Sequence, residues 1–327
     1  MPSRLQTSAA IVSLGLGFAA GLDGAPAARV TRDVVYGKAG AETLRLDVGE
    51  PAGEGPFPVA ILVHGGGWTR GDKAGSDRPG DSADISPWFA PLTAAGLVWF
   101  SINYRLAPAH RWPACFEDVQ TAIRWVKAHA GDYGGDPRRI ALLGHSAGGH
   151  LVCLAATTAG EATRVQAVVG FAPVTDFESE LPARGGLSPS LQALLDRPRA
   201  VTPESLAILR DIAPVTHVRA GLPPFLFVQG DADRTVPIEE TRRFAAKLQG
   251  ADVPCDFIVI PGAPHRLLAW AEADPVYLDK VVAWLKRRLA EPSAPSAGAR
   301  TGLHRTEPVA ASEARARPVT AQRRTVR

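Results

Sequence analysis

Short apolar segments alternate with longer helix-patterned segments along most of this 327-residue chain, and this alternation restricts the fold more than any other feature. Each apolar segment is continuous and rich in β-branched residues, as is typical of strands that are buried on both faces. A strand-helix-strand order favours parallel pairing, because each helix carries the chain back to the start of the next strand. The sequence therefore predicts an α/β fold, with helices on both faces of a mostly parallel central sheet. The predicted strands cover residues 59–63, 97–102, 140–143, 167–171, 225–228 and 257–260, and the predicted helices cover 113–130, 149–158, 238–249 and 275–289.

Two segments depart from this alternation. Residues 30–36 and 44–48 alternate apolar and polar side chains, which predicts an antiparallel pair at the edge of the sheet. Residues 177–222 contain several prolines and glycines and a short amphipathic stretch at 190–195. A long insertion between strands is usually functional, and ligands of open α/β sheets bind at the carboxyl ends of the strands. We therefore predict a small cap or lid over those ends; the alternative is a surface excursion with only a packing role.

The first 27 residues have the order of an export signal. Arg4 precedes an apolar stretch over residues 9–22, and the small residues Ala25-Pro26-Ala27 follow as a cleavage site. Cleavage after Ala27 would yield a periplasmic or secreted protein. The apolar stretch is too short to span a bilayer comfortably, so we expect no stable membrane insertion.

The positive charge of the chain is concentrated at its C-terminal end. The formal net charge is +3, whereas residues 291–327 alone contain seven arginines and three acidic residues, a net +4, so the remainder is near 3 − 4 = −1. These last residues include almost no large apolar side chain, which predicts a disordered basic tail after a single domain at residues 28–290. The tail is either a solvated terminus or an arm that adheres to a surface or binds nucleic acid, and the behaviour of chain ends favours the solvated terminus. Since the body has no basic stripe with interleaved aromatic residues, nucleic acid is not an expected partner.

The cysteines and histidines do not form a metal-site pattern. Cys115, Cys153 and Cys255 each lie among apolar neighbours, so we expect buried free thiols, although the count also allows one disulfide. No Cys/His spacing is that of a metal site. We therefore expect neither a metal nor an organic cofactor, and the sequence leaves the oligomeric state open.

A Gly-x-Ser-x-Gly motif, Gly144-His145-Ser146-Ala147-Gly148, joins a predicted strand to a predicted helix. In this context the motif is typical of a nucleophile elbow, a tight turn that holds a serine hydroxyl above the end of the sheet. A serine in such a turn has strained backbone angles, and side chains two positions to either side would collide. This explains both glycines and makes Ser146 the candidate nucleophile.

Three consecutive glycines follow an earlier predicted strand, in the segment His64-Gly65-Gly66-Gly67-Trp68. Glycines at a strand end let the backbone approach a ligand and present N–H groups to it. The segment has neither the lysine and serine of a P-loop nor the spacing of a dinucleotide site. We therefore predict an oxyanion hole, with donor N–H groups from this loop and from the residue after the nucleophile. The predicted donors are Gly66, Gly67, Trp68 and Ala147.

An acidic residue and then a histidine follow two later predicted strands. This is the chain order in which the partners of a serine elbow occur: serine, then acid, then histidine. Asp233 comes after the strand at 225–228, and His265 comes after the strand at 257–260. Asp233 is the candidate acid and His265 the candidate base. Asp231 is the alternative acid, although an aspartate so close to a strand end often caps a loop.

The other histidines are less suited to the role of base. His64 is expected to brace the glycine loop, and His145 and His150 flank the elbow, facing the next helix or the pocket wall. The rest lie away from strand ends or in the tail: His110, His129, His217 and His304.

Taken in order, these motifs resemble those of an α/β-hydrolase from the esterase branch that carries a His-Gly-Gly-Gly loop. The resemblance covers roughly residues 30–289. It rests on the glycine loop with Trp68, the segment Tyr104-Arg105-Leu106-Ala107-Pro108, the elbow, Asp233 before Val236-Pro237, and His265.

Within this branch, Trp68 followed by Gly71-Asp72-Lys73 is similar to the bacterial bifunctional feruloyl and acetyl xylan esterases. Arylformamidases share the His-Gly-Gly-x-Trp feature, and hormone-sensitive-lipase-like esterases share the segment at 104–108. Two residues depart from the usual patterns: Ala109 stands where the lipase-like esterases usually have glutamate, and Pro264 stands where glycine is common before the histidine.

The resemblance implies a serine hydrolase with a triad of Ser146, Asp233 and His265, an acyl-enzyme and no cofactor. The implied substrates are carboxylic esters with acetyl, feruloyl or other short acyl groups, either small molecules or esters linked to plant polysaccharide. One alternative is an arylformamidase-like amide hydrolase. The alternative of another class is a non-catalytic binding protein that uses the same cleft.

Overall fold

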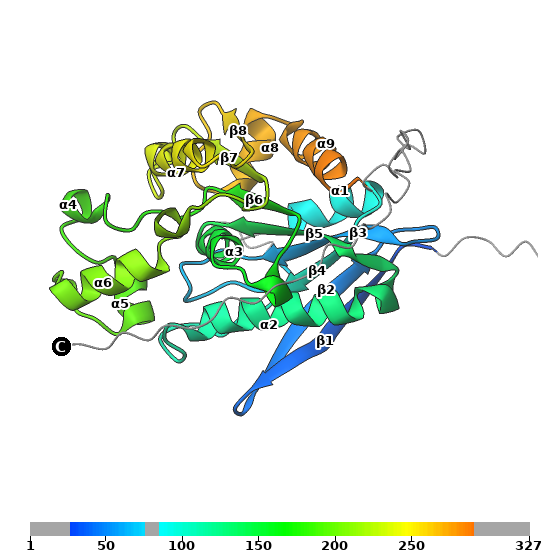
Figure 1. Cartoon of the computed structure of the whole chain (residues 1–327), viewed down its shortest axis with the longest axis horizontal. Helices are drawn as coiled ribbons and strands as arrows, with labels where there is room; N and C mark the ends of the chain where they lie inside the picture. Colours follow the sequence, from blue (N-terminus) through cyan, green and yellow to red (C-terminus); the bar gives the residue numbers. More distant parts are fainter. Residues whose placement is uncertain (1–26, 76–84, 291–327) are drawn as a thin grey trace, which may run out of the picture. The chain divides into compact units, whose positions relative to one another are not determined.

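The computed structural model describes residues 27–75 and 85–290, and these contain one sheet of eight strands in the order β1-β2-β4-β3-β5-β6-β7-β8 (Figure 1). β1 pairs with β2 and β2 with β4 in antiparallel fashion, while the other neighbouring strands are parallel. The predicted α/β class and the antiparallel edge pair are therefore confirmed. The strands are β1 (Arg29–Ala39), β2 (Glu42–Glu50), β3 (Phe57–Val63), β4 (Val98–Ile102), β5 (Gly135–His145), β6 (Ala167–Phe171), β7 (Phe225–Gly230) and β8 (Cys255–Ile260).

Helices occupy the connections between the parallel strands, as the alternation predicts. The four predicted helices correspond to α2, α3, α7 and α9, and α3 begins earlier than predicted because its first residue belongs to the elbow itself. The helices are α1 (Phe89–Ala94), α2 (Ala114–His129), α3 (Ala147–Thr157), α4 (Leu181–Arg184), α5 (Pro189–Leu195), α6 (Pro203–Ile212), α7 (Ile238–Gly250), α8 (Trp270–Ala273) and α9 (Tyr277–Arg288). Short 3₁₀ turns lie at Ser86–Trp88, Ala130–Tyr133, Glu161–Thr163, Pro214–His217 and Leu267–Ala269.

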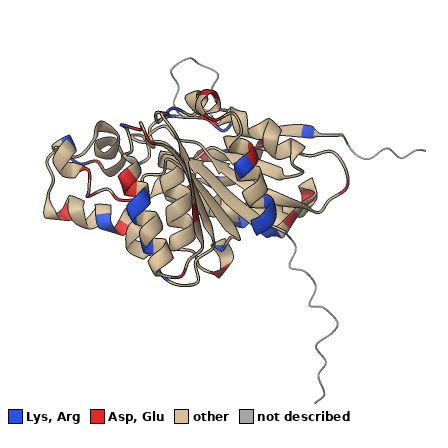
Figure 2. Ribbon diagram, turned by 90° about the horizontal axis from the view of Figure 1, so that it is seen from above, with Lys and Arg blue, Asp and Glu red and all other residues tan. Residues whose placement is uncertain are grey.

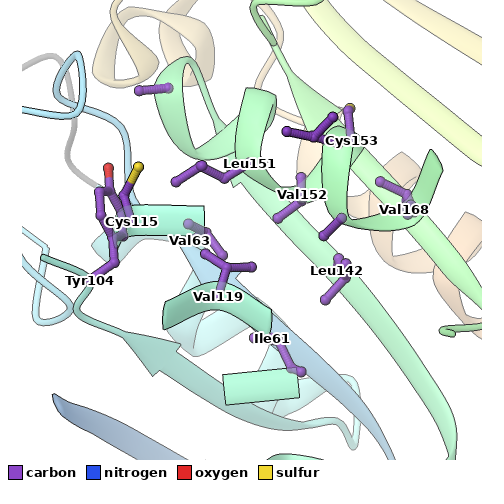
Figure 3. Close-up of a cluster of buried hydrophobic side chains, with 14 of the residues drawn as sticks. Ile61, Val63, Tyr104, Cys115, Val119, Leu142, Leu151, Val152, Cys153 and Val168 are labelled. Carbon is purple, nitrogen blue, oxygen red and sulfur yellow. The ribbon is translucent and has the colours of Figure 1, made fainter. Parts of the chain in front are cut away.

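Side chains alternate across the sheet, so the core consists of two apolar layers. Ile61 of β3 lies in the layer that contains Val119 of α2, part of which is shown in Figure 3. The next residue, Leu62, lies in the opposite layer with Leu92 of α1 and Trp284 of α9. Full burial of one such aliphatic side chain contributes about 1.5–3 kcal/mol, which is why both layers hold the strand ends in fixed positions.

The last strand corrects one expectation. β8 is an edge strand whose side chains are only partly covered, and Val259 is 37% exposed. The prediction that every continuous apolar run is covered on both faces is wrong here, because β8 is the outermost strand of the described sheet and its neighbours cover it only in part. The three cysteines are free; Cys115 and Cys153 are buried as predicted, whereas Cys255, on β8, is only half-buried.

The insertion at 177–222 forms α4, α5 and α6, which gather at one end of the sheet (Figure 1). α5 coincides with the predicted amphipathic stretch, but α4 and α6 were not predicted. Thr202 and Ser205 form a capping box at the start of α6, with Pro203 at its first position. This sequence signal could have identified α6.

The predicted export signal, apart from residue 27, and the predicted basic tail lie outside the described residues. Within the described ranges no helix has the length and apolar character needed to cross a membrane. Figure 2 shows Lys and Arg interspersed with Asp and Glu over the helices and loops.

Candidate active site

Ser146 occupies a sharp turn between β5 and α3. Its backbone has φ 54° and ψ −117°, a conformation that is strained for any residue with a side chain. A Cβ atom on Gly144 would lie 2.3 Å from the carbonyl oxygen of Gly148, and one on Gly148 would lie 2.2 Å from that of Val63. The turn therefore requires glycine at both positions for the steric reason that the sequence suggested.

Three side chains from different strand ends meet in one hydrogen-bond chain. Nε2 of His265 lies 2.9 Å from Oγ of Ser146, and Nδ1 of His265 lies 2.7 Å from Oδ2 of Asp233. Since a carboxylate accepts and does not donate, Nδ1 carries the proton and Nε2 is left to accept the serine hydroxyl proton. The geometry is that of a nucleophile, a base and an orienting acid.

The two candidate acids make different contacts. Asp233 is buried, and its Oδ1 accepts the backbone N–H groups of Thr235 at 2.8 Å and Val236 at 2.9 Å, which leaves Oδ2 for the histidine. Asp231 instead accepts the N–H of Gly262 at 2.6 Å through its Oδ1. Asp231 therefore braces the loop that carries the histidine and does not touch the ring.

The glycine loop, residues 64–68, lies beside Ser146. Gly67, Trp68 and Ala147 line a cavity together with Ser146, whereas Gly66 is not among its lining residues. The carbonyl of Gly66 accepts two backbone N–H groups at 3.2 Å, so this residue closes the turn of the loop. Gly67, Trp68 and Ala147 thus lie beside the serine, and the role of all four residues as oxyanion donors stays a prediction.

His64 and Tyr104 stabilise the glycine loop through hydrogen bonds and a ring stack. The Tyr104 hydroxyl lies 3.0 Å from the carbonyl oxygen of His64 and 3.2 Å from that of Gly65, and the two rings stack with centroids 4.4 Å apart. Burial raises the pKa of Tyr104 well above its ordinary value, so the hydroxyl remains a donor. Nδ1 of His64 lies 2.8 Å from the carbonyl oxygen of Gly65, so the bracing role predicted for His64 is confirmed, and Tyr104 shares that role.

The cavity beside Ser146 has a volume of about 230 Å³. Residues of the insertion form much of its wall, with the apolar side chains of Phe177, Leu181 and Leu191. Ser190 approaches the glycine loop closely, because a Cβ on Gly67 would lie 2.7 Å from its Oγ. The insertion therefore defines the space available to a ligand above the serine.

One buried carboxyl group in the cavity wall was not identified from the sequence. Glu240 lies in the first turn of α7, and its Oε1 accepts the backbone N–H groups of Thr175 and Asp176, where the chain leaves β6 for the insertion. Burial raises the pKa of Glu240 to about 7. Because a glutamate in a helical pattern is usually solvated, nothing in the sequence distinguished it from its neighbours.

This shifted pKa predicts a stability difference that depends on pH. The folded protein favours the protonated form of Glu240, so the associated stabilisation is complete below its ordinary pKa of 4.5 and is lost as the pH rises through about 7. A Glu240→Gln variant stays neutral and keeps the accepting oxygen. Between pH 4.5 and 8 the unmodified protein loses this stabilisation and the variant does not. We therefore expect the free energy of unfolding of the variant, relative to that of the unmodified protein, to rise by up to about 3 kcal/mol over this range.

Urea titrations at several pH values measure this difference. Glu239→Gln is the matched control, because Glu239 is exposed and pairs with Arg242 on the surface of the same helix. A gap between Glu240→Gln and the unmodified protein that stays constant with pH would contradict the prediction.

The two histidines beside the elbow are buried and do not contact Ser146 through their side chains. Nε2 of His145 lies 3.1 Å from the carbonyl oxygen of His265, and burial lowers the pKa of His145 well below its ordinary value. His145 therefore stays neutral and donates to the backbone of the candidate base. His150 bonds to the glycine loop and to the insertion.

Sequence comparisons place this chain among esterases. It is 37% identical over 227 residues to the probable carboxylic ester hydrolase LipM of Mycobacterium tuberculosis, covering 64% of this chain and 49% of LipM. It is 36% identical over 250 residues to esterase LipC of the same organism, covering 72% of this chain and 59% of LipC. The chain thus spans about half the length of the curated relatives that it matches.

Among solved structures, the native Est2 esterase of Thermogutta terrifontis matches with a TM-score of 0.62 and 28% identity, over 82% of this chain and 96% of that one. The sequence model of the BD-FAE family matches residues 46–248. Since this match covers more than half of the chain and includes the glycine loop, the elbow and Asp233, the protein belongs to the BD-FAE family and has the α/β-hydrolase fold.

Proposed function

We propose that this protein is an exported serine esterase that hydrolyses carboxylic esters with short acyl groups. The observation that carries the proposal is the hydrogen-bond chain from Ser146 through His265 to Asp233, with distances of 2.9 and 2.7 Å, at the wall of a cavity. The esterase names of the relatives support the same reaction class.

The proposed reaction has two halves. His265 takes the proton of Ser146 as Oγ bonds to the ester carbonyl carbon. The N–H groups of Gly66, Gly67, Trp68 and Ala147 are the proposed donors to the oxyanion. When the tetrahedral intermediate collapses, the alcohol leaves with the proton from His265 and an acyl-serine remains. Water then attacks the acyl-serine with His265 as base, releasing the carboxylic acid and restoring the serine. No step requires a metal or an organic cofactor.

The cavity supports a short acyl group. Its volume of about 230 Å³ and its apolar wall suit an acetyl to butyryl chain. Structures of the Thermogutta terrifontis esterase have been solved with propionate and with butyrate bound. We extend the proposal to acetyl and feruloyl esters on plant polysaccharide because of the resemblance to the bifunctional esterases.

A substrate panel tests this proposal. We expect p-nitrophenyl acetate and butyrate to be turned over at least tenfold faster than the decanoate ester, because a longer chain exceeds the cavity. Acetylated xylan and methyl ferulate test the natural ester class, and N-formylaniline tests the amide alternative. Faster release from the formamide than from the acetate would favour an amidase. Absence of both turnover and labelling by a fluorophosphonate probe would favour the binding-protein alternative.

We also propose that residues 1–27 are removed on export, leaving a catalytic domain at residues 28–290 with its cap at 177–222. The sequence pattern at the N-terminus supports this. Intact-mass measurement of protein recovered from the periplasm or the medium is expected to give a chain that begins at Ala28. A retained Met1 would overturn the cleavage.

A further inference from the structure

His150 is a buried polar residue on α3, one turn after Ser146. Its ring makes two hydrogen bonds to segments that are distant in the sequence. Nε1 of Trp68 lies 3.2 Å from Nδ1 of His150, and Nε2 of His150 lies 2.8 Å from the carbonyl oxygen of Ile212. One side chain therefore joins the elbow helix, the glycine loop and the end of α6 in the insertion.

The chemistry of the two partners allows only one state of the ring. An indole N–H donates and does not accept, and a carbonyl oxygen accepts and does not donate. Nδ1 of His150 must therefore carry the lone pair and Nε2 the proton. Burial lowers the pKa of His150 to about 4, so this neutral form persists at neutral pH.

Trp68 needs such an anchor. Its backbone φ is 59°, in the left-handed region that a large side chain rarely adopts, and the residue lines the cavity beside Ser146. A second bond holds its backbone, because its carbonyl accepts the N–H of Ala107 at 2.9 Å. The indole bond to His150 fixes the side chain, and together the two bonds determine where the neighbouring N–H groups point.

The Ile212 bond acts on the other wall of the site. Ile212 is the last residue of α6, and Phe177, which begins the insertion, packs edge-on against His150 with ring centroids 5.0 Å apart. The cap residues that line the cavity are thereby attached to the same ring that holds the glycine loop.

We propose that His150 is a positioning residue for ester hydrolysis. Through the Trp68 indole it sets the oxyanion-binding loop, and through the Ile212 carbonyl it holds the cap against that loop. This rests on the proposed esterase function. The two bonds are expected to affect different kinetic constants. The bond to Trp68 acts on kcat, because the loop contacts the transition state, and the bond to Ile212 acts on KM, because the cap contacts the bound substrate.

Two substitutions at this position separate the bonds. In His150→Asn the amide oxygen takes the place of Nδ1 and keeps the acceptor for Trp68, but the bond to Ile212 is lost. In His150→Gln the amide nitrogen reaches the place of Nε2 and keeps the donor to Ile212, but Trp68 loses its acceptor. On p-nitrophenyl acetate we expect His150→Gln to lower kcat about tenfold with KM within about twofold. We expect His150→Asn to raise KM several-fold with kcat largely kept.

Trp68→Phe removes the same indole bond from the other side. We expect it to lower kcat about tenfold, and the double variant with His150→Gln to lower it no further, because both changes remove one interaction. His129→Gln is the matched control: like His150, His129 lies against a tryptophan ring, that of Trp125, but it is at the far end of α2, so the kcat of this variant stays at the unmodified value. Equal losses of kcat in His150→Asn and His150→Gln, or multiplicative losses in the double variant, would overturn the proposal.

A ¹H–¹⁵N correlation spectrum of protein labelled with [¹⁵N]tryptophan tests the bond between Trp68 and His150 independently of any activity assay. The indole cross-peak of Trp68 is the one missing from Trp68→Phe, and we expect it to move in His150→Gln and to stay in place in His150→Asn. An unmoved peak in His150→Gln overturns the inference. If the unmodified protein proves inactive on every ester, the esterase proposal fails while this spectrum still decides whether His150 anchors Trp68. If His150→Gln does not fold, the kinetics of Trp68→Phe decide whether the indole bond matters for catalysis. An unchanged kcat in Trp68→Phe would overturn the proposal.

Discussion

Replacing Ser146 with alanine is expected to lower kcat for p-nitrophenyl acetate by about 10⁶-fold, the largest effect of any single substitution in this chain. The variant has no atom that can bond to the acyl carbon, so the acyl-enzyme cannot form. The residual rate comes from the donor N–H groups and from substrate binding, which act on direct attack by water. The strained turn at φ 54° remains, since alanine has a Cβ like serine.

Single-turnover and steady-state assays measure this loss, and a fluorophosphonate probe is expected to label the unmodified protein alone. Ser179→Ala is the control, because Ser179 is an exposed serine of the insertion whose hydroxyl donates to the backbone carbonyl of Asp176. An alanine variant that kept more than about a thousandth of the rate would show that another group is the nucleophile.

Replacing Asp233 with asparagine is expected to lower kcat by about 10⁴-fold while the fold is retained. The N–H groups of Thr235 and Val236 both point at one side of this carboxylate, so the amide oxygen of the asparagine will occupy that side. The NH₂ group of the asparagine then faces His265. Because an NH₂ group donates, Nδ1 of His265 must accept a hydrogen bond from it instead of donating one. The proton moves to Nε2, which can no longer take the proton of Ser146.

Asp231→Asn is the matched control for this substitution. Asp231 uses one carboxylate oxygen to accept the N–H of Gly262, and an asparagine keeps that oxygen. We expect kcat to stay within about threefold of the unmodified value, since a retained hydrogen bond leaves the histidine loop in place. A larger loss in Asp231→Asn than in Asp233→Asn would reverse the assignment of the acid.

Most of the sheet was predictable because its central strands are short, continuous apolar runs rich in β-branched residues, as is typical of buried strands. β8 shows the limit of this argument. Its composition resembles that of the central strands, yet Val259 is exposed on what is the outermost strand of the described sheet. The order of strands in a sheet depends on pairings between distant segments, and a local pattern does not contain them.

The insertion was predicted as a segment but not in detail. Its prolines and glycines marked the break in alternation, and α6 carries a recognisable capping box at Thr202. The residues that meet the glycine loop, such as Ser190, carry no such mark. Which cap residues touch the cavity depends on how α5 packs, and that packing joins segments more than a hundred residues apart.

The sequence by itself determined the fold class, the elbow around Ser146 and the order of the candidate triad. These follow from local rules: a turn that demands two glycines, and side chains placed just after strands whose carboxyl ends share one edge. Only the tertiary structure decided that His265 meets Asp233 and not Asp231, that Gly67 and Trp68 line the cavity beside Ser146, and that Glu240 and His150 are buried with partners. Hydrogen-bond distances, tautomers and pKa shifts arise from contacts across 31 to 120 residues, and only the packed core brings those groups within bonding distance.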